Sequence, residues 1–441
     1  MLHKIKIHSV IFLSLMCVSS YAQEIYTLEK CMELAIQNNA KSRNSTLSIE
    51  AAMRTKKEAF TNFFPSVSAM GAGFKATDPM MAMDIPLGDL LGDPAMPPVS
   101  MGMLEKGIIG VATVSQPVYA GGQIITGNKL AKLGVEVSKL QKTMSDDEVR
   151  LTVEQYYWQI VSLHEKVKTI AEAETLLNRA HQDVKNAFEA GLINKHDLLK
   201  VELKQNELES GKLRVANGLK LSKMALAQYV GVPYQNFEVD TTILNAEINM
   251  LHARIDHQSA LQQRVEYQLL NKSVEAEKMQ VKMEIGKHLP TVAVGAGWNY
   301  MHFDKDSPMA METDFGMGFA TVSLPITTWW GGSHAIKKQK INLQIAENNK
   351  RDAEEMLLIQ MQQLRDEVEE ATLQLQLSEK AIVSALENVR LNADYYEAGT
   401  GLLTDLLDAQ NALQQARDQR TEAMTNYRIK LSRYQQATGQ R

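Results

Sequence analysis

Two carboxylates near the C-terminus are close enough in the sequence to act together. Asp405 and Asp408 are three residues apart in a helix-patterned segment that follows Gly399-Thr400-Gly401. This spacing predicts that both side chains lie on one face of the helix. Acidic residues in the first turns of a helix also suit its macrodipole, so a solvated helix start is a second interpretation of the pair.

No other set of residues indicates a reaction. The motifs of serine hydrolases, zinc proteases, P-loop enzymes and dinucleotide-binding folds do not occur in the sequence. The histidines show no recurring metal-ligand spacing. Methionine thioethers could bind Cu(I), but methionine is common in this chain, so we favour loop packing for Met70, Met80, Met81, Met83, Met96, Met101, Met103, Met309 and Met311. We therefore expect no enzyme activity, no metal site and no cofactor.

The N-terminus has the pattern of a secretory signal peptide. Two lysines precede an apolar run at residues 10–18, and the Ser-Tyr-Ala of residues 20–22 has small side chains at the two positions that signal peptidase recognises. Removal of residues 1–22 would leave 45 basic and 52 acidic side chains, a balance that does not favour nucleic acid. Cys31 would be the one remaining cysteine, so we expect no internal disulfide.

Two halves of the chain repeat the same order of motifs, which predicts an internal duplication. Phe188-Glu-Ala-Gly and Tyr396-Glu-Ala-Gly are each followed by a short link and Asp-Leu-Leu, which begins at Asp197 and Asp405. Each motif lies between two helix-patterned segments and therefore predicts the tip of a helical hairpin. At the second tip we expect Gly399 to end one helix and Thr400 to cap the next.

Four segments have the short period of β-strands: residues 66–74, 107–119, 291–302 and 315–327. In the third, an apolar face ending in aromatic residues alternates with a small polar face, as in a transmembrane strand. A water-soluble two-layer β-domain produces the same alternation. Residues 75–106, with five prolines, are expected to form a long loop.

The strand count bears on assembly. Beyond the signal there is no run of ~18 apolar residues, so any membrane-spanning elements must be strands. Four strands are too few to close a barrel, which needs about eight. If these strands span a membrane, several chains must therefore contribute to one barrel.

Very long helices are predicted after each strand pair. Residues 122–188 and 333–396 contain no proline and would each extend roughly 100 Å, with return helices at 197–230 and 404–437. These elements divide the chain into a signal peptide at 1–22, a first repeat at 23–230, an equatorial insert at 231–262 and a second repeat at 263–441. The first repeat holds strand pair 66–119 and hairpin 122–230. The second repeat holds strand pair 291–329 and hairpin 333–437.

Together, the duplicated strand pair, Pro65 and Pro290 at the strand entries, and the paired tip motifs resemble the TolC-like outer-membrane efflux proteins. The resemblance covers nearly all of the chain after the signal. It implies a mixed, mostly α fold, in which a β-barrel of four strands per chain and twelve per trimer continues into a long α-helical coiled-coil barrel.

The resemblance also implies a function. The chain would be a homotrimeric exit duct in the outer membrane, with its helices in the periplasm, that passively conducts substrates from a periplasmic adaptor protein and an inner-membrane transporter to the exterior. The cargo, whether drugs, metals or proteins, is left open. The alternative is a periplasmic or surface coiled-coil protein without a channel, such as an adhesin, which would leave the amphipathic strands and acidic tip unexplained.

Positions that match the family's motifs receive expected roles. Asp405 and Asp408 match acidic residues that ring the periplasmic entrance, where three copies would attract cations. Tyr396 and Asp197 match a hydrogen-bonded pair that helps to close the entrance. The family's closing arginine falls on Gly401 and its threonine partner on His196, so that link is not expected here.

The hairpin tips are expected to contact the adaptor. The matching positions are Gly191, Leu192, Ile193, Gly399, Thr400 and Leu402. Exposed leucine and isoleucine at a tip suit a partner interface, whereas burial between adjacent hairpins would explain the same residues without a partner.

Overall fold

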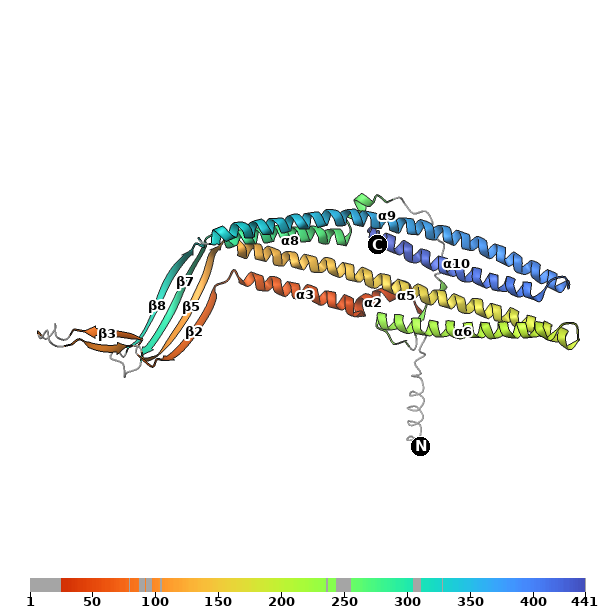
Figure 1. The fold of residues 1–441 in the computed structure, drawn as a ribbon, viewed down its shortest axis with the longest axis horizontal. Coiled ribbons are helices and arrows are strands. Elements are labelled where there is room, and N and C mark those ends of the chain that lie inside the picture. Colours follow the sequence, from red (N-terminus) through yellow and green to blue (C-terminus); the bar gives the residue numbers. More distant parts are fainter. Residues whose placement is uncertain are drawn as a thin grey trace, which may run out of the picture. The chain divides into compact units, whose positions relative to one another are not determined.

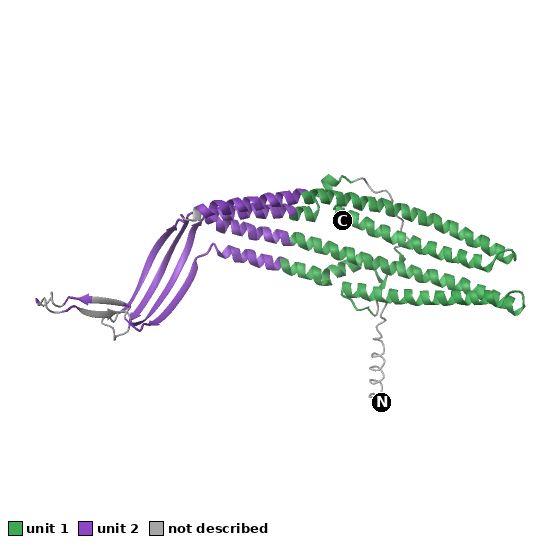
Figure 2. Cartoon of the chain, in the orientation of Figure 1, with its two compact units in different colours: residues 1–48, 139–269, 352–441 green, residues 49–138, 270–351 purple. Residues whose placement is uncertain are grey.

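The computed structural model describes residues 25–440 apart from 79, 87–91, 93–96, 104, 235–236, 243–254, 304–310 and 327. The expected signal peptide and two of the methionines, Met96 and Met309, lie outside the described residues. The chain divides into two compact units, residues 1–48, 139–269 and 352–441 in the first and residues 49–138 and 270–351 in the second (Figure 2). Within the described ranges, no helix combines the length and apolar content needed to cross a membrane.

The second unit holds a four-stranded antiparallel sheet of order β2-β5-β7-β8 (Figure 1). Its strands are β2 (Ser66–Lys75), β5 (Lys106–Ala120), β7 (Thr291–Phe303) and β8 (Met311–Ser323). The four segments predicted from sequence are therefore strands, but β8 begins and ends four residues before the predicted 315–327. Leu324-Pro325 ends the strand, because proline cannot donate to a sheet ladder.

One face of this sheet is apolar and exposed. The register places Val67 opposite Val114, Val114 opposite Ala296 and Ala296 opposite Gly318, so these residues share a face. The large apolar side chains on that face are exposed: Val67, Ile108, Val114, Val294, Trp298 and Val322. Among the strands that the structure describes, the two outer ones, β2 and β8, each pair on one side only.

The segment expected to be a long loop contains a second strand pair. Strands β3 (Met81–Ile85) and β4 (Val99–Met103) pair in antiparallel register, Met81 opposite Met103. The expectation of an irregular loop at 75–106 is therefore wrong over these ten residues. The five prolines misled it, because all of them lie outside the two strands.

Each of the four strands connects to a helix, and all four connections lie at the same end of the sheet. α3 (Ala40–Thr61) leads into β2, α5 (Gln123–Glu189) follows β5, α8 (Val265–Lys287) leads into β7, and α9 (Thr328–Glu397) follows β8. A pair of glycines stands at two of these junctions, and the two pairs behave differently. Gly121 and Gly122 have φ of 59° and 75° and form the turn before α5, whereas Gly331 and Gly332 lie inside the first turns of α9.

The first unit contains the two helical hairpins and the main core. α6 (Lys195–Val230) returns from α5, and α10 (Leu403–Ala437) returns from α9 (Figure 1). α2 (Leu28–Asn38) is capped by Thr27, whose side chain accepts a hydrogen bond from the Lys30 amide. Its buried face joins all four hairpin helices in the core: Leu28, Cys31, Ala35, Val149, Val153, Tyr157, Ile160, Leu226, Val230, Leu375 and Met424. Burial in this core raises the pKa of the Cys31 thiol to about 12.

The insert between the halves is partly regular. β6 (Glu238–Val239) pairs in parallel with β1 (Ile25–Tyr26), and the short helix α7 (His257–Leu261) begins at Asp256, whose carboxylate caps it. The Tyr157 hydroxyl on α5 donates to the Asp240 carbonyl at 2.7 Å and so fixes this pair to the core.

Candidate functional site at the hairpin tips

The first tip is a tight helix ending built around one glycine. α5 ends at Glu189, and Gly191 follows with φ of 72°. The Gly191 amide donates to the Phe188 carbonyl at 2.9 Å, and the Leu192 amide donates to the Ala187 carbonyl at 2.9 Å. These two bonds define a Schellman ending, which places a residue in the left-handed region where glycine is favoured.

The second tip repeats the same geometry. After α9, Gly399 has φ of 70° and its amide donates to the Tyr396 carbonyl, while the Thr400 amide donates to the Tyr395 carbonyl, both at 3.0 Å. The expectation that Thr400 caps the next helix is wrong. Its hydroxyl donates back to the Tyr395 carbonyl at 3.2 Å, and α10 begins at Leu403, with Leu402 as an N-cap residue that makes no side-chain hydrogen bond.

An apolar cluster joins the two tips within the first unit. Its buried members are Leu177 and Val184 of α5, Val201 of α6, and Leu403 and Leu407 of α10. Partly buried side chains at both tips pack against it: Ile193, Leu198, Leu208 and Tyr396. The cluster therefore holds the two hairpins together where their chains turn.

The predicted docking residues divide between exposed and packed positions. Leu192 and Leu402 are 78% and 67% exposed, so one leucine projects from each tip. Gly191, Gly399 and Thr400 are also exposed. Ile193 instead packs against the apolar cluster, which corresponds to the interpretation of burial between adjacent hairpins.

The acidic pair lies on the exposed side of α10. Asp405 and Asp408 are both exposed, whereas Leu406, Leu407 and Ala409 between and beyond them are buried. The three-residue spacing therefore gives the shared face that the sequence predicted. Asp405 also lies in the first turn of its helix, where the macrodipole favours a carboxylate.

The residues matched to entrance closing are near one another but are not joined directly. Tyr396 is half-buried, and burial together with the carboxylates of Asp183 and Asp197 raises the pKa of its phenol. In the described part of the chain, no hydrogen bond joins the Tyr396 hydroxyl to Asp197, which instead lies 4.0 Å from the Lys200 ammonium. The Tyr396–Asp197 link thus stays a prediction.

Gly401 is fixed by close backbone contacts. A Cβ added there would lie 2.9 Å from the Tyr395 Cβ and 3.1 Å from both the Tyr395 carbonyl carbon and the Tyr396 nitrogen. The Gly401 amide donates to the Tyr395 carbonyl at 2.9 Å. His196, the other departure from the family pattern, is exposed in the first turn of α6.

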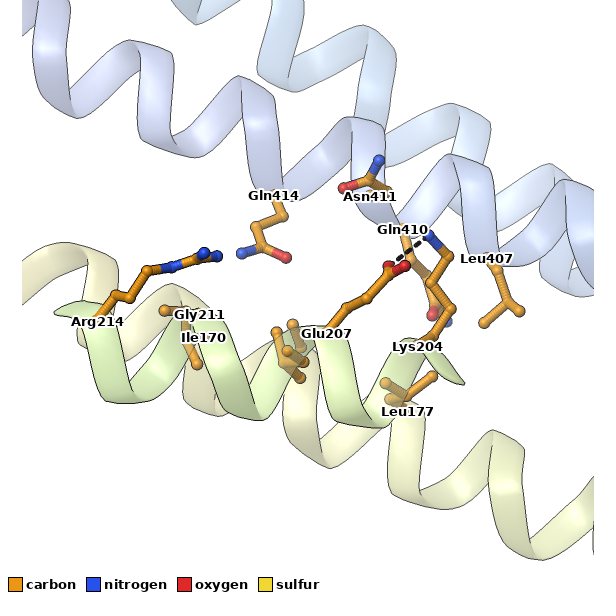
Figure 3. Close-up of a pocket in the computed structure, with 12 residues that line it drawn as sticks. Ile170, Leu177, Lys204, Glu207, Gly211, Arg214, Leu407, Gln410, Asn411 and Gln414 are labelled. Atoms are coloured by element: carbon orange, nitrogen blue, oxygen red, sulfur yellow. Dashed lines mark hydrogen bonds and ion pairs between the residues drawn. The ribbon is translucent and has the colours of Figure 1, made fainter. Parts of the chain in front are cut away.

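A cavity of about 260 Å³ lies behind the tips, between α5, α6 and α10 (Figure 3). Ile170, Leu177 and Leu407 are among its apolar lining residues, and the side chains of Arg214 and Gln414 point toward one another across it. The Lys204 ammonium lies 2.8 Å from the Glu207 carboxylate. The sequence interpretation missed these residues, although positions 204, 207, 211 and 214 recur at a helical spacing that could have indicated a shared face.

Ion pairs join the two hairpins farther along α10. The Lys166 ammonium of α5 lies 2.6 Å from the Glu422 carboxylate, and Arg417 pairs with Glu172 of α5. Asp418, between them, is half-buried, and this burial raises the pKa of its carboxyl. The pairs connect α10 to α5 at two positions.

Among the described residues, no group of three or more His, Cys, Asp or Glu side chains could hold a metal ion.

The sequence and structure resemble known proteins. Residues 257–440 match the family model described as "Outer membrane efflux protein". The outer membrane protein TolC of Vibrio cholerae is 20% identical over 294 residues, which are 66% of this chain and 67% of that protein.

Solved structures share the fold at low identity. The outer membrane protein VceC of Vibrio cholerae matches with a TM-score of 0.73 and 15% identity over 93% of this chain and 96% of its own. The open state of the MtrE outer membrane channel of Neisseria gonorrhoeae matches with a TM-score of 0.72 and 15% identity, over 93% and 88% of the two chains. The family match over residues 257–440, the TolC relative and the shared fold agree with the tip motifs, so this chain is similar to the outer membrane efflux proteins in sequence and in fold.

Proposed function

We propose that this chain is the exit channel of an outer-membrane efflux or secretion system and that it works as a homotrimer. The observation that carries the proposal is the sheet of the second unit, which exposes a continuous apolar face and has two outer strands that each pair on one side only. An apolar face of this kind favours lipid, whereas unpaired backbone groups in lipid cost several kcal/mol each. Pairing β2 of one copy with β8 of the next satisfies both, and three copies give a closed barrel of twelve strands.

The long helices support association of several copies. α9 carries a row of exposed large apolar side chains: Ile341, Ile345, Met356, Ile359, Leu373, Leu377, Val383 and Leu386. α6 carries another: Leu199, Leu203, Leu213 and Leu221. Helices of this length with unburied apolar rows need coiled-coil neighbours, which identical copies would supply.

The tips then form the periplasmic end of the duct. Three copies bring six carboxylates, from Asp405 and Asp408, around one axis, where they would concentrate cations at the entrance. Leu192 and Leu402 offer one exposed apolar contact on each tip for the periplasmic adaptor. The duct itself conducts passively, and the adaptor's inner-membrane transporter supplies the energy.

Channel formation in a defined bilayer tests the proposal. The full chain, extracted from outer membranes in mild detergent, is expected to migrate as a heat-sensitive trimer and to give stepwise currents in planar bilayers. Divalent cations added on the tip side should block these currents. A monomer that passes no current would overturn the proposal and leave a structural coiled-coil role.

A further inference from the structure

All four strands join helices at the same end of the sheet, and the sequence around these junctions is strongly basic. The antiparallel register puts the start of β2, the end of β5, the start of β7 and the end of β8 at this one edge. The four fifteen-residue stretches at the junctions, 51–65, 121–135, 276–290 and 326–340, contain 11 Lys and Arg but only 3 Glu and no Asp. The whole chain has a net charge of −5, so this concentration of positive charge opposes the overall balance.

The opposite edge of the sheet is acidic. The described residues there, within 75–106 and 303–314, include five acidic side chains and two lysines: Asp78, Asp84, Glu105, Glu312, Asp314, Lys75 and Lys106. The sign of the charge in the second unit therefore changes from one end of the strands to the other. Solubility alone does not require such a separation of charge.

Most of the junction cations form no ion pair within the part of the chain that the structure describes. Three of them are in ion pairs, Arg54 with Glu50, Lys278 with Glu347 and Lys287 with Glu284. The other eight are exposed lysines that form no ion pair with another described residue: Lys56, Lys57, Lys129, Lys132, Lys282, Lys337, Lys338 and Lys340. We call these eight residues the lysine collar.

Exposed aromatic and aliphatic side chains lie between the lysine collar and the strands. Phe60, Phe63 and Phe64 form a cluster at the end of α3, with ring centroids 5.6 and 5.4 Å from Phe60, and all three are exposed. Trp330 in the first turn of α9 is 82% exposed. Large side chains at the other junctions continue the band: Val118, Tyr119, Ile125, Leu289, Leu324 and Ile326.

This order of chemistry along each helix matches the inner surface of a bilayer. Apolar strands are followed by exposed aromatic rings and then by unpaired ammonium groups, which lie within roughly 20 Å of the strand ends along the helices. Aromatic rings favour the interface, and lysine stems can extend along apolar surface while the ammonium group reaches a headgroup phosphate. Each basic residue near an anionic surface strengthens lipid binding on the order of fivefold.

We propose that the lysine collar binds the phosphates of anionic phospholipids, such as phosphatidylglycerol, in the leaflet that faces the helices. The inference rests on the proposed function, because it requires the sheet to lie in a membrane. The bound lipids neutralise the collar and fix the depth of the strands in the bilayer. Free inorganic phosphate lacks the acyl chains that would contact the aromatic band, so it binds far more weakly.

Native mass spectrometry of the detergent-extracted full chain tests lipid binding directly. The protein is incubated with phosphatidylglycerol or phosphatidylethanolamine, and bound lipids are counted. The expected result is preferential retention of phosphatidylglycerol, which inorganic phosphate does not displace. The triple variant Lys337→Gln, Lys338→Gln, Lys340→Gln should lose at least tenfold in apparent affinity for phosphatidylglycerol and little for phosphatidylethanolamine.

A matched variant removes the same charge elsewhere. Lys185, Lys220 and Lys380 are exposed lysines of the first unit that form no ion pair with another described residue, and their replacement by glutamine should leave lipid selectivity unchanged. Equal retention of the two lipids by the unmodified protein, or equal loss in both triple variants, overturns the inference.

Conductance of the same preparations separates this inference from the proposed function. Currents from a trimer that shows no preference for phosphatidylglycerol would overturn the lysine collar alone. A chain that neither assembles nor conducts in any lipid would overturn both.

Discussion

At the scale of single residues, the tips depend on backbone conformations that only glycine adopts easily. Gly191 and Gly399 have positive φ and open space around them, so a side chain at either position meets no steric obstacle. The cost of a substitution there comes from the backbone alone. Gly401 differs, because its φ lies outside the left-handed region but a Cβ there would meet the preceding turn.

We expect Gly399→Leu to abolish export while the trimer still forms. The left-handed conformation costs a non-glycine residue roughly 1–2 kcal/mol, which the tip can avoid by rearranging its turn. Drug or dye efflux in a strain lacking the native gene measures the loss, and detergent gels measure assembly. Gly127→Ala, in the helical part of α5 with no atom within 4 Å of its Cβ, is the control and should retain export. Full export by Gly399→Leu would contradict the docking role.

We expect Gly401→Ala and Gly401→Arg to loosen the second tip to a similar extent. The obstacle is the Cβ, which both variants share, so restoring the family's arginine cannot simply restore its link. Hydrogen exchange at the amides of Thr400 and Gly401, which donate to the Tyr395 carbonyl, should accelerate in both variants. Unchanged exchange in Gly401→Ala would show that the turn accommodates a side chain.

At the scale of elements, periodicity predicted the long helices well, because uninterrupted helix-patterned segments leave few alternatives. Observed α5 spans Gln123–Glu189, close to the predicted 122–188. The prediction missed β3 and β4, where prolines around the strands suggested a loop, and misplaced the start of α9, because Gly331 and Gly332 were expected to precede the helix. The cavity that Arg214 and Gln414 line depends on how the two hairpins pack together, and no local sequence pattern specifies that packing.

We expect β2 and β8 of adjacent copies to cross-link. In a Cys31→Ser background, Ser68→Cys is combined in turn with Phe319→Cys, Thr321→Cys or Ser323→Cys, since the inter-copy register is not set by the single chain. One combination should form a covalent trimer on oxidation, seen on non-reducing gels. Thr113→Cys replaces Ser68→Cys in the control, because β5 is paired on both sides. Failure of all three combinations would contradict the shared barrel.

At the scale of the whole molecule, the family and its general fold followed from sequence, because two tip motifs and two strand pairs occur in the same order. The closing of the entrance did not follow. In the proposed trimer it would depend on contacts between copies, and the two departures, His196 and Gly401, remove the matched residues without indicating what replaces them.

We expect Asp405→Asn combined with Asp408→Asn to weaken block by divalent cations at least tenfold without reducing the open current strongly. Three copies would lose six negative charges at the entrance, and the attraction for cations falls with them. Planar-bilayer recordings with cation added on the tip side measure the change. Asp352→Asn combined with Glu355→Gln, exposed or partly exposed acids in the middle of α9, is a control of equal charge. An identical block in the double tip variant would place the cation site elsewhere.

Because β1 pairs in parallel with β6, β1 cannot pair until β6 has been synthesised. Ile25 pairs beside Glu238, so the first strand has no neighbour until synthesis has passed that point. At roughly 5–20 residues per second, the interval is on the order of 10–40 s. Throughout that interval β1 must stay unpaired.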